Sequence, residues 1–251
     1  MFEGFGGAGD GARRRSNTPA PAIAPRRRPP PRLVLQGSRR SREPGATIYA
    51  QSDPAEFIYQ VVSGVVRTIT LNRDGRRIVH GFHLPGEIFG LEREIFGLER
   101  EKIHHCSAEA VTETELVQCP VTRLNVLAET DKAAAKALWM SLLVSRDRTA
   151  ERFLYVLHGT AFERLAYFLI DLAWRTQSPA RIELPMSRYD IADYLGLSSE
   201  TVSRTFTALR TRGLISTKGR EVRLLREMLR VGDARRVADD EEGPHRPRTL
   251  P

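Results

Sequence analysis

The sequence predicts an α+β protein in which a β-rich roll is followed by a long helix and then a winged helix-turn-helix. Between residues 43 and 128, short runs rich in Val, Ile and Thr alternate with turn residues, which is typical of antiparallel strands. Residues 129–158 keep apolar side chains at helical spacing. Residues 191–225 form the pattern of a short helix, a tight turn, a second helix and two strands, the order of a winged helix-turn-helix.

These changes of pattern divide the chain into five segments. Residues 1–42 are rich in Gly, Pro and Arg and are expected to form a disordered tail, because they lack the apolar residues needed for a core. Residues 43–128 are expected to form the roll, 129–158 the long helix and 159–230 the winged helix-turn-helix. Residues 231–251 are polar and are expected to be a second tail.

The net charge of +8 says little about partners, because all of it comes from the first 42 residues. That segment holds ten arginines against two acidic residues, which leaves residues 43–251 neutral. Residues 181–226 contain nine basic and five acidic residues, a local charge of +4. This is a modest basic surface of the kind that phosphates attract.

Several classes of protein are excluded by composition. The chain has no apolar run of about 18 residues and no apolar signal segment near Met1, which predicts a cytoplasmic protein with no membrane partner. Its two cysteines, Cys106 and Cys119, are too few for a disulfide framework. No glycine-rich phosphate loop, carboxylate pair or Ser/His/Asp arrangement stands out, so we expect no enzymatic activity.

The roll is predicted from five segments that alternate or cluster β-formers. They read FIYQVVSG, VVRTITL, RRIVHGFHL, SAEAV and ELVQCPV, and the second and third are joined by NRDG. Asp74-Gly75 is a strong signal for a hairpin turn. So many short strands at this spacing favour a closed or sandwich-like roll.

A tandem duplication interrupts the roll. Residues 87–93 read EIFGLER, and residues 94–100 repeat the same seven letters. Seven residues are close to two turns of a helix, so both copies can project their apolar side chains to nearly one side.

The long helix is expected to begin after a cap at Thr130-Asp131. Its apolar seam approximates a and d spacing, and is formed by Leu138, Leu142, Thr149, Phe153 and Val156. Such a seam packs against a partner helix or against the helix's own domain.

The last third of the chain has two opposed helix faces. Val202, Phe206 and Leu209 are spaced to face inward, after a turn at Gly196 and a cap at Ser198. The opposite face carries Glu200, Ser203 and Arg204. Arg can donate two hydrogen bonds to guanine, and Glu can accept one from cytosine. The alternative is an ordinary solvated face on a winged helix that contacts protein.

The E-x-x-S-R pattern within LSSETVSRTFTALRTRGLIS resembles the recognition helix of the Crp/Fnr regulators, in their Fnr and FixK branch. Crp-type members resemble R-E-x-x-x-R, whereas this chain has Ser199 before Glu200 and Ser203 before Arg204. The resemblance extends from about Gly45 to Arg230, with the roll similar to a cyclic-nucleotide-binding jelly roll. It implies a transcription activator that binds a TTGA-type pseudo-palindrome in double-stranded DNA.

The resemblance also implies roles for individual residues. Base contacts fall to Glu200, Ser203 and Arg204. Phosphate contacts, which set register without reading sequence, are expected from Ser199, Thr201, Arg210, Lys218 and Arg220. Because the family dimerises through the long helix, the seam named above is the expected homodimer interface.

Two further implications concern partners and target genes. RNA polymerase is expected to contact exposed loops, with residues 176–180 and the turn of Asn72, Arg73, Asp74 and Gly75 as candidates. The FixK branch implies control of genes for low-oxygen respiration or nitrogen fixation.

No cofactor is expected. Cyclic-AMP-binding members pair the phosphate with an Arg before Ser or Thr, but here Cys106 precedes Ser107, although Gly86-Glu87 is present. A thiol cannot neutralise a phosphate as a guanidinium does. Residues 1–50 contain no cysteine for an iron–sulfur cluster. The alternative is a regulator of the same superfamily gated by haem or another ligand.

Two questions stay open at the level of sequence. His104, His105 and Cys106, with His80 and His83, are metal-ligand types, but strand alternation puts His105 opposite its neighbours, so no metal site is predicted. The duplicated segment lies where the family contacts its effector. It either fills the cavity or leaves one copy extruded as a loop.

Overall fold

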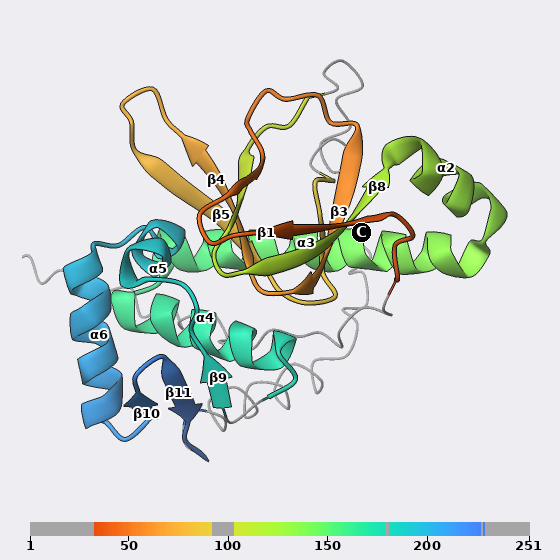
Figure 1. The fold of residues 1–251 in the computed structure, drawn as a ribbon. Coiled ribbons are helices and arrows are strands. Elements are labelled where there is room, and N and C mark those ends of the chain that lie inside the picture. Colours follow the sequence, from red (N-terminus) through yellow and green to blue (C-terminus); the bar gives the residue numbers. More distant parts are fainter. Residues whose placement is uncertain (1–32, 92–102, 179–180, 227, 229–251) are drawn as a thin grey trace, which may run out of the picture.

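A computed structural model describes residues 33–91, 103–178, 181–226 and 228 (Figure 1). The predictions for residues 1–32, for the tail at 231–251 and for the second EIFGLER copy lie outside the described residues. Among the described residues, no helix is both long enough and apolar enough to span a membrane.

The predicted roll is confirmed as two facing antiparallel sheets of four strands each, in the orders β1-β8-β3-β6 and β2-β7-β4-β5. Its strands are β1 (Ser38–Arg42), β2 (Thr47–Tyr49), β3 (Phe57–Ser63), β4 (Val66–Leu71), β5 (Arg77–His83), β6 (Ile88–Phe89), β7 (Ser107–Ala110) and β8 (Thr114–Pro120). The NRDG segment joins β4 to β5 as a hairpin, with Leu71 opposite Arg77.

The prediction that all of residues 1–42 are disordered is wrong for residues 33–42. Strand β1 pairs along its length with β8. Leu33 and Leu35 are buried, and the Gln60 side chain donates to the Leu33 carbonyl (2.5 Å) and accepts from the Leu35 amide (2.9 Å). An Arg-rich strand is tolerated here because it lies at a sheet edge, where Arg39 is exposed and pairs with Glu115.

The long helix predicted over residues 129–158 corresponds to a single helix that starts at Lys132, and a separate helix that the sequence analysis did not predict precedes it. Helix α2 (Val121–Thr130) ends at Asp131, and α3 (Lys132–His158) begins there. Asp131 is extended, with φ −123°, and its carboxylate accepts from the amides of Ala133 and Ala134. The predicted cap is therefore confirmed, and the same residue ends the preceding helix, so residues 129 and 130 belong to α2.

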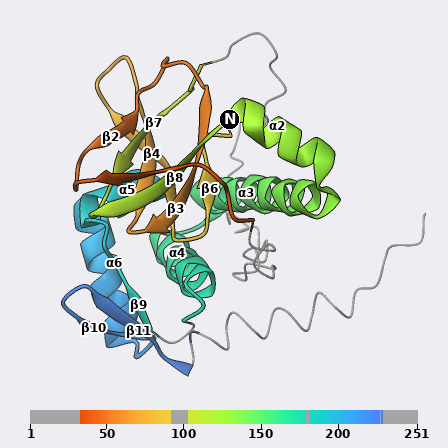
Figure 2. The same ribbon diagram turned by 45° about the vertical axis from the view of Figure 1, so that its right-hand side comes forward.

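The winged helix-turn-helix begins with a mostly buried helix, α4 (Ala161–Arg175). Helices α5 (Arg188–Leu195) and α6 (Ser199–Thr211) meet at Gly196, which has φ +63° and thus supplies the left-handed turn. The wing strands β10 (Ile215–Lys218) and β11 (Glu221–Leu224) pair with each other, and the short β9 (Arg181–Glu183) adds to the sheet. Figures 1 and 2 both place α4 between α3 and the wing.

One apolar core joins the roll to the winged helix. Val79 and Phe82 of β5 belong to the same buried cluster as Phe168 of α4 and Tyr194 of α5. The ring of Phe82 lies 6.1 Å from that of Phe168 and 5.4 Å from that of Tyr194. The two domains of one subunit therefore pack as a unit in this region.

Residues 87–91, the described part of the first EIFGLER copy, are not helical. Ile88 and Phe89 form β6 opposite Gln60 and Tyr59, which corrects the expectation of helical projection. Phe89 is buried and stacks on Tyr59 and His83, with ring centres 5.3 and 5.0 Å apart. Phe89 therefore occupies part of the inside of the roll. A short strand alternates its side chains between two faces, which a helical period cannot represent.

Burial alternates over residues 104–106 as predicted, although these residues precede β7 and are not part of a strand. His104 and Cys106 are buried, while His105 between them is half-buried. His104 stacks on Tyr49 with 3.6 Å between ring centres. Within residues 33–91 and 103–228, apart from 179, 180 and 227, no three His, Cys, Asp or Glu side chains gather as a metal site would require.

Candidate nucleic-acid interface

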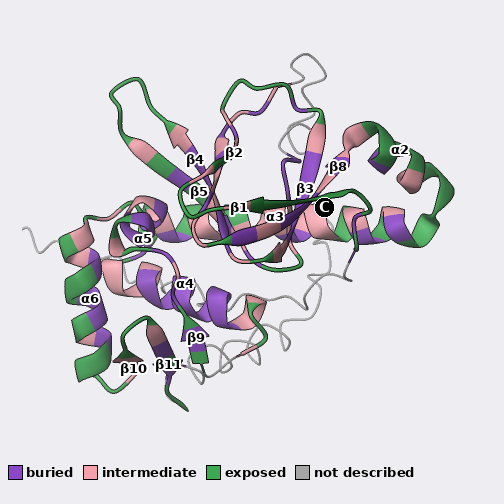
Figure 3. Ribbon diagram, viewed as in Figure 1, coloured by how far each residue is buried: buried purple, intermediate pink, exposed green. Residues whose placement is uncertain are grey.

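Helix α6 presents a polar row on the outside of the molecule. Glu200, Ser203 and Arg204 are exposed, as their spacing predicts. The opposite row of Val202, Phe206 and Leu209 is buried. In Figure 3 the outer side of α6 is coloured as exposed along its length and stands at the edge of the molecule. A helix held in this way can enter a major groove with its polar row foremost.

The first turn of α6 sets the charge of Glu200 and the direction of Arg204. The Ser198 hydroxyl accepts from the Thr201 amide (3.2 Å) and caps the helix. The pKa of Glu200 is lowered by its own backbone amide and by the hydroxyls of Ser198 and Ser199. The carboxylate is therefore ionised at neutral pH and accepts hydrogen bonds. Arg204 Nη2 lies 3.4 Å from the Thr201 hydroxyl oxygen, which directs the guanidinium along the same face.

Two arginines from other helices hold α6 in place. The guanidinium of Arg188 in α5 stacks over the Phe206 ring at 3.3 Å. Arg164 of α4 donates to the carbonyls of Leu195 and Gly196, at 3.1 and 3.3 Å. Sequence reasoning missed both residues, because these contacts join helices that the local pattern treats separately.

Capping boxes fix where α4 and α5 begin. Thr160 and Glu163 form one at α4, and Ser187 and Asp190 form the other at α5. Both have a readable signal that sequence analysis did not use: a Ser or Thr followed three residues later by an acid. Each box satisfies two helix-end amides and so sets the start of a helix that supports α6.

The predicted phosphate contacts fall in two groups. Ser199 and Thr201 lie at the start of α6, where backbone amides also favour anions. Lys218 and Arg220 are exposed on either side of Gly219 at the tip of the wing. Arg210 is exposed in the last turn of α6, about 16 Å along the helix axis from Ser199, so it cannot share a phosphate with that group.

Comparison with known proteins matches both halves of the chain. Residues 163–229 match the Crp-like helix-turn-helix domain, and residues 39–131 match the cyclic nucleotide-binding domain. The nitrogen fixation regulation protein FixK of Rhizobium meliloti (strain 1021) is 42% identical over 188 residues, covering 75% of this chain and 80% of that protein. The chain belongs to the Crp/Fnr family, in its FixK branch.

Other similar members of the Crp/Fnr family agree. The transcriptional activator protein Anr of Pseudomonas aeruginosa is 36% identical, covering 77% of this chain and 78% of that protein. The structure of FixK2 from Bradyrhizobium japonicum superposes with a TM-score of 0.70 at 36% identity, covering 79% of this chain and 97% of that one. These relatives are transcription regulators and not enzymes, and this Crp/Fnr chain is a DNA-binding transcription regulator.

In this Crp/Fnr chain the Gly86-Glu87 turn is committed to internal contacts. Glu87 accepts from Arg175 at 2.9 and 2.7 Å and from the Leu84 amide at 3.0 Å, and Arg148 lies 3.4 Å away. Burial opposes ionisation of Glu87, but Arg175 and Arg148 outweigh it and lower the pKa to about 2. The carboxylate that family resemblance assigns to an effector is thus bound by the protein itself.

The predicted dimer seam on α3 differs from the stripe that is exposed: four of its five residues lie one position before a residue of that stripe, and Phe153 belongs to both. Leu138 and Leu142 pack against the core of their own domain, and Val156 is half-buried. Thr149 and Phe153 are exposed. The exposed or half-exposed residues that keep strict a and d spacing are Trp139, Leu143, Arg146, Ala150, Phe153 and Leu157.

The hairpin proposed for polymerase contact stands clear of the roll. Asn72, Arg73, Asp74 and Gly75 are all exposed. The Gly75 amide donates to the Asn72 carbonyl at 2.9 Å, and Gly75 has φ +73°. The tip is therefore a defined turn whose side chains are available to a partner.

Proposed function

We propose that the chain is a homodimeric activator that reads a TTGA-type pseudo-palindrome through α6 without a cyclic nucleotide or iron–sulfur effector. The observation that carries the proposal is the exposed row of Glu200, Ser203 and Arg204 on a capped helix with a buried apolar back. Arg204 contacts guanine, Glu200 the facing cytosine or adjacent adenine, and Ser203 a neighbouring base edge or phosphate. Lys218 and Arg220 contact the phosphates of the DNA backbone.

Dimerisation is supported by the stripe on α3. Phe153, Leu157 and Trp139 are 59, 54 and 63% exposed, an unusual density of large apolar side chains for a solvated helix. A second copy related by a dyad would cover the stripe on both subunits. Two α6 helices would then enter successive major grooves about 34 Å apart.

Independence from a cyclic nucleotide is supported by three features of the roll. Glu87 is bound by Arg175 and Arg148. Cys106 stands where a phosphate-binding arginine is expected, and Phe89 fills the interior. A nucleotide would have to displace a buried aromatic ring and a charge pair without a guanidinium to receive its phosphate.

The names of the relatives support the proposed target genes, and exposure supports the proposed polymerase contact. The Rhizobium meliloti relative described above is named for regulation of nitrogen fixation, and we assign this chain to genes of nitrogen fixation or low-oxygen respiration. The exposed tip at Asn72–Gly75 is the surface that we assign to RNA polymerase.

The test is binding of untreated protein to a TTGA dyad and to a scrambled duplex of the same composition, at one fixed salt concentration. We expect the dyad to bind about a thousandfold more tightly or better. Equal binding to both duplexes contradicts the proposal. Parallel titrations contain added cyclic AMP or haem, and preference that appears only in their presence establishes a ligand-gated regulator instead.

A further inference from the structure

Two strands of the roll hold the first helix of the helix-turn-helix through a cluster of ion pairs. Arg67 of β4 lies 2.7 Å from Asp190 of α5 and 2.7 Å from Glu109 of β7. Arg77 of β5 lies 2.9 Å from Asp190 and 2.8 Å from Asp193. We call Arg67, Arg77, Asp190 and Asp193 the hairpin clamp. It joins residues more than 110 positions apart in the chain.

The ion pairs of the clamp are partly shielded from solvent. The side chains of Asp190 and Arg67 are 5% and 18% exposed. An ion pair in such surroundings is screened little by salt, and removing one partner leaves the other charge desolvated and uncompensated. Arg77 and Asp193, at 26% and 32% exposed, form its accessible edge.

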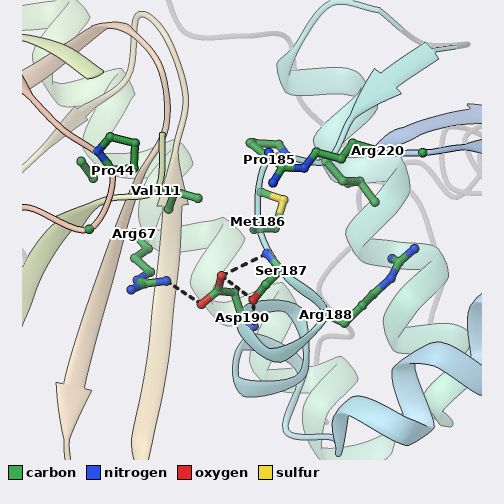
Figure 4. Close-up of a pocket in the computed structure, with 13 residues that line it drawn as sticks. Pro44, Arg67, Val111, Pro185, Met186, Ser187, Arg188, Asp190 and Arg220 are labelled. Carbon is green, nitrogen blue, oxygen red and sulfur yellow. Dashed lines mark hydrogen bonds and ion pairs between the residues drawn. The ribbon is translucent and has the colours of Figure 1, made fainter. Parts of the chain in front are cut away.

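Packing is incomplete beside the clamp. A cavity of about 540 Å³ lies between the roll and the winged helix, lined by Pro44 and Val111 on one side and by Met186 and Arg220 on the other. Figure 4 shows Arg67 reaching along its wall to Asp190, which also accepts from Ser187. On this side of the interface side chains do not fill the gap, so the ion pairs of the clamp hold α5 against the roll here, alongside the shared apolar core of Phe82, Phe168 and Tyr194.

Whatever orients α5 also orients α6. The two helices are joined by the short turn at Gly196, and Arg188 of α5 stacks on Phe206 of α6. Arg164 binds both carbonyls of that turn. A tilt of α5 against the roll is therefore carried directly to Glu200, Ser203 and Arg204.

We propose that the hairpin clamp is a positioning device that holds α6 at the angle a two-fold operator requires, in place of an effector. Arg67 and Arg77 are positioning residues, because they act on DNA through α5. The proposal rests on the proposed function. A dyad needs two recognition helices at a fixed separation, whereas a single half-site needs only one intact winged helix.

The test compares a TTGA dyad with a duplex that has one intact and one scrambled half-site. We expect Arg77→Gln to weaken dyad binding about tenfold and to leave half-site binding unchanged. Arg77→Lys, which keeps the charge, should retain most of the dyad affinity. The matched control is Arg76→Gln, which removes the same charge from the exposed neighbouring residue and should preserve the ratio of the two affinities.

A double-mutant cycle of Arg77→Gln with Asp193→Asn tests whether Asp193 is the partner through which Arg77 acts. If Arg77 acts through Asp193, the affinity of the double variant for the dyad should be no lower than that of whichever single variant binds the dyad more weakly. The proposal is overturned if Arg77→Gln binds the dyad as tightly as the parent. It is also overturned if the variant loses the same factor of affinity for both duplexes, because that result indicates a folding defect of the winged helix. Failure of the parent itself to prefer the dyad refutes the proposed function and is seen before any variant is made.

Discussion

The proposed DNA contacts are of two kinds, those that read bases and those that bind phosphate, and the two kinds should respond differently to salt. Lys218 stands exposed at the wing tip, away from the row on α6. We predict that Lys218→Ala weakens binding to the TTGA dyad and to scrambled duplex by the same factor. It should also lower the slope of log affinity against log salt by about one, because one fewer counterion is released.

The matched control is Lys132→Ala, which removes the same charge at the start of α3. It should leave the salt slope unchanged. A Lys218→Ala variant that loses dyad binding while keeping scrambled binding would show that the wing reads sequence.

Sequence reasoning succeeds for single residues whose environment is local. The helical period alone separates Glu200, Ser203 and Arg204 from Val202 and its inward neighbours, because one helix decides both faces. It fails for Arg188 and for Arg77, whose partners lie 18 and 116 positions away. Nothing in their immediate neighbours distinguishes them from solvated arginines.

At the scale of elements, the proposed dimer depends on the exposed stripe of α3. We predict that Phe153→Glu, in the exposed stripe, converts the dimer to a monomer in sedimentation at micromolar concentration. The charge would be placed in an apolar seam against its own copy. Arg146→Leu should tighten the dimer instead, because Arg146 occupies a seam position where two cations would meet across the dyad.

Leu138→Ala is the informative comparison, because Leu138 belonged to the seam predicted from sequence. It packs on its own core, so its loss should lower the free energy of unfolding by about 2 kcal/mol with little effect on pairing. Dissociation by Leu138→Ala but not by Leu157→Glu, which changes a residue of the exposed stripe alone, would restore the predicted register.

Elements with regular patterns could be predicted, and those that depend on neighbours could not. The strands β3, β4, β5, β7 and β8 follow from their β-forming runs and turns. Strand β1 was missed because its SRRSR sequence has no apolar alternation, and only β8 makes it a strand. The cap at Asp131 predicts the start of a helix, but a cap does not show that another helix ends at the same residue.

At the scale of the whole molecule, the Glu87 cluster ties the roll to α3 and α4. The folded pKa of Glu87, about 2, lies below its ordinary value of 4.5. The cluster therefore contributes stability that is full above about pH 4.5 and is lost as the pH falls toward 2, on the order of 3 kcal/mol. We predict that Glu87→Gln is less stable than the parent at pH 7, and that this difference shrinks between pH 5 and pH 3.

Urea unfolding at several pH values measures the difference. Glu115→Gln, which removes the partner of the exposed Arg39, should cost little at any pH. A Glu87→Gln difference that stays constant from pH 7 to pH 3 would show that the carboxylate charge is not what joins the domains.

The domain order was predictable, but the relation between the domains was not. Local patterns indicate a roll, helices and a winged helix in turn. The shared core of Phe82 with Phe168, and the ion pairs of Arg67 and Arg175, arise only when distant segments meet. The contacts of Glu87 are another example. The Gly86-Glu87 pair can be recognised in the sequence, but the arginines that bind Glu87 come from α3 and α4.

The proposed function depends most on the contact between Arg204 and a base, and a double-mutant cycle between protein and DNA measures that contact. Arg204→Ala should cost about 1–3 kcal/mol on a TTGA dyad, and replacing the guanine of each half-site should cost the parent a similar amount. The variant should then show no further loss on the guanine-substituted dyad. Independent, additive losses, or a variant that binds the TTGA dyad as tightly as the parent, would contradict the assignment of α6 as the reader.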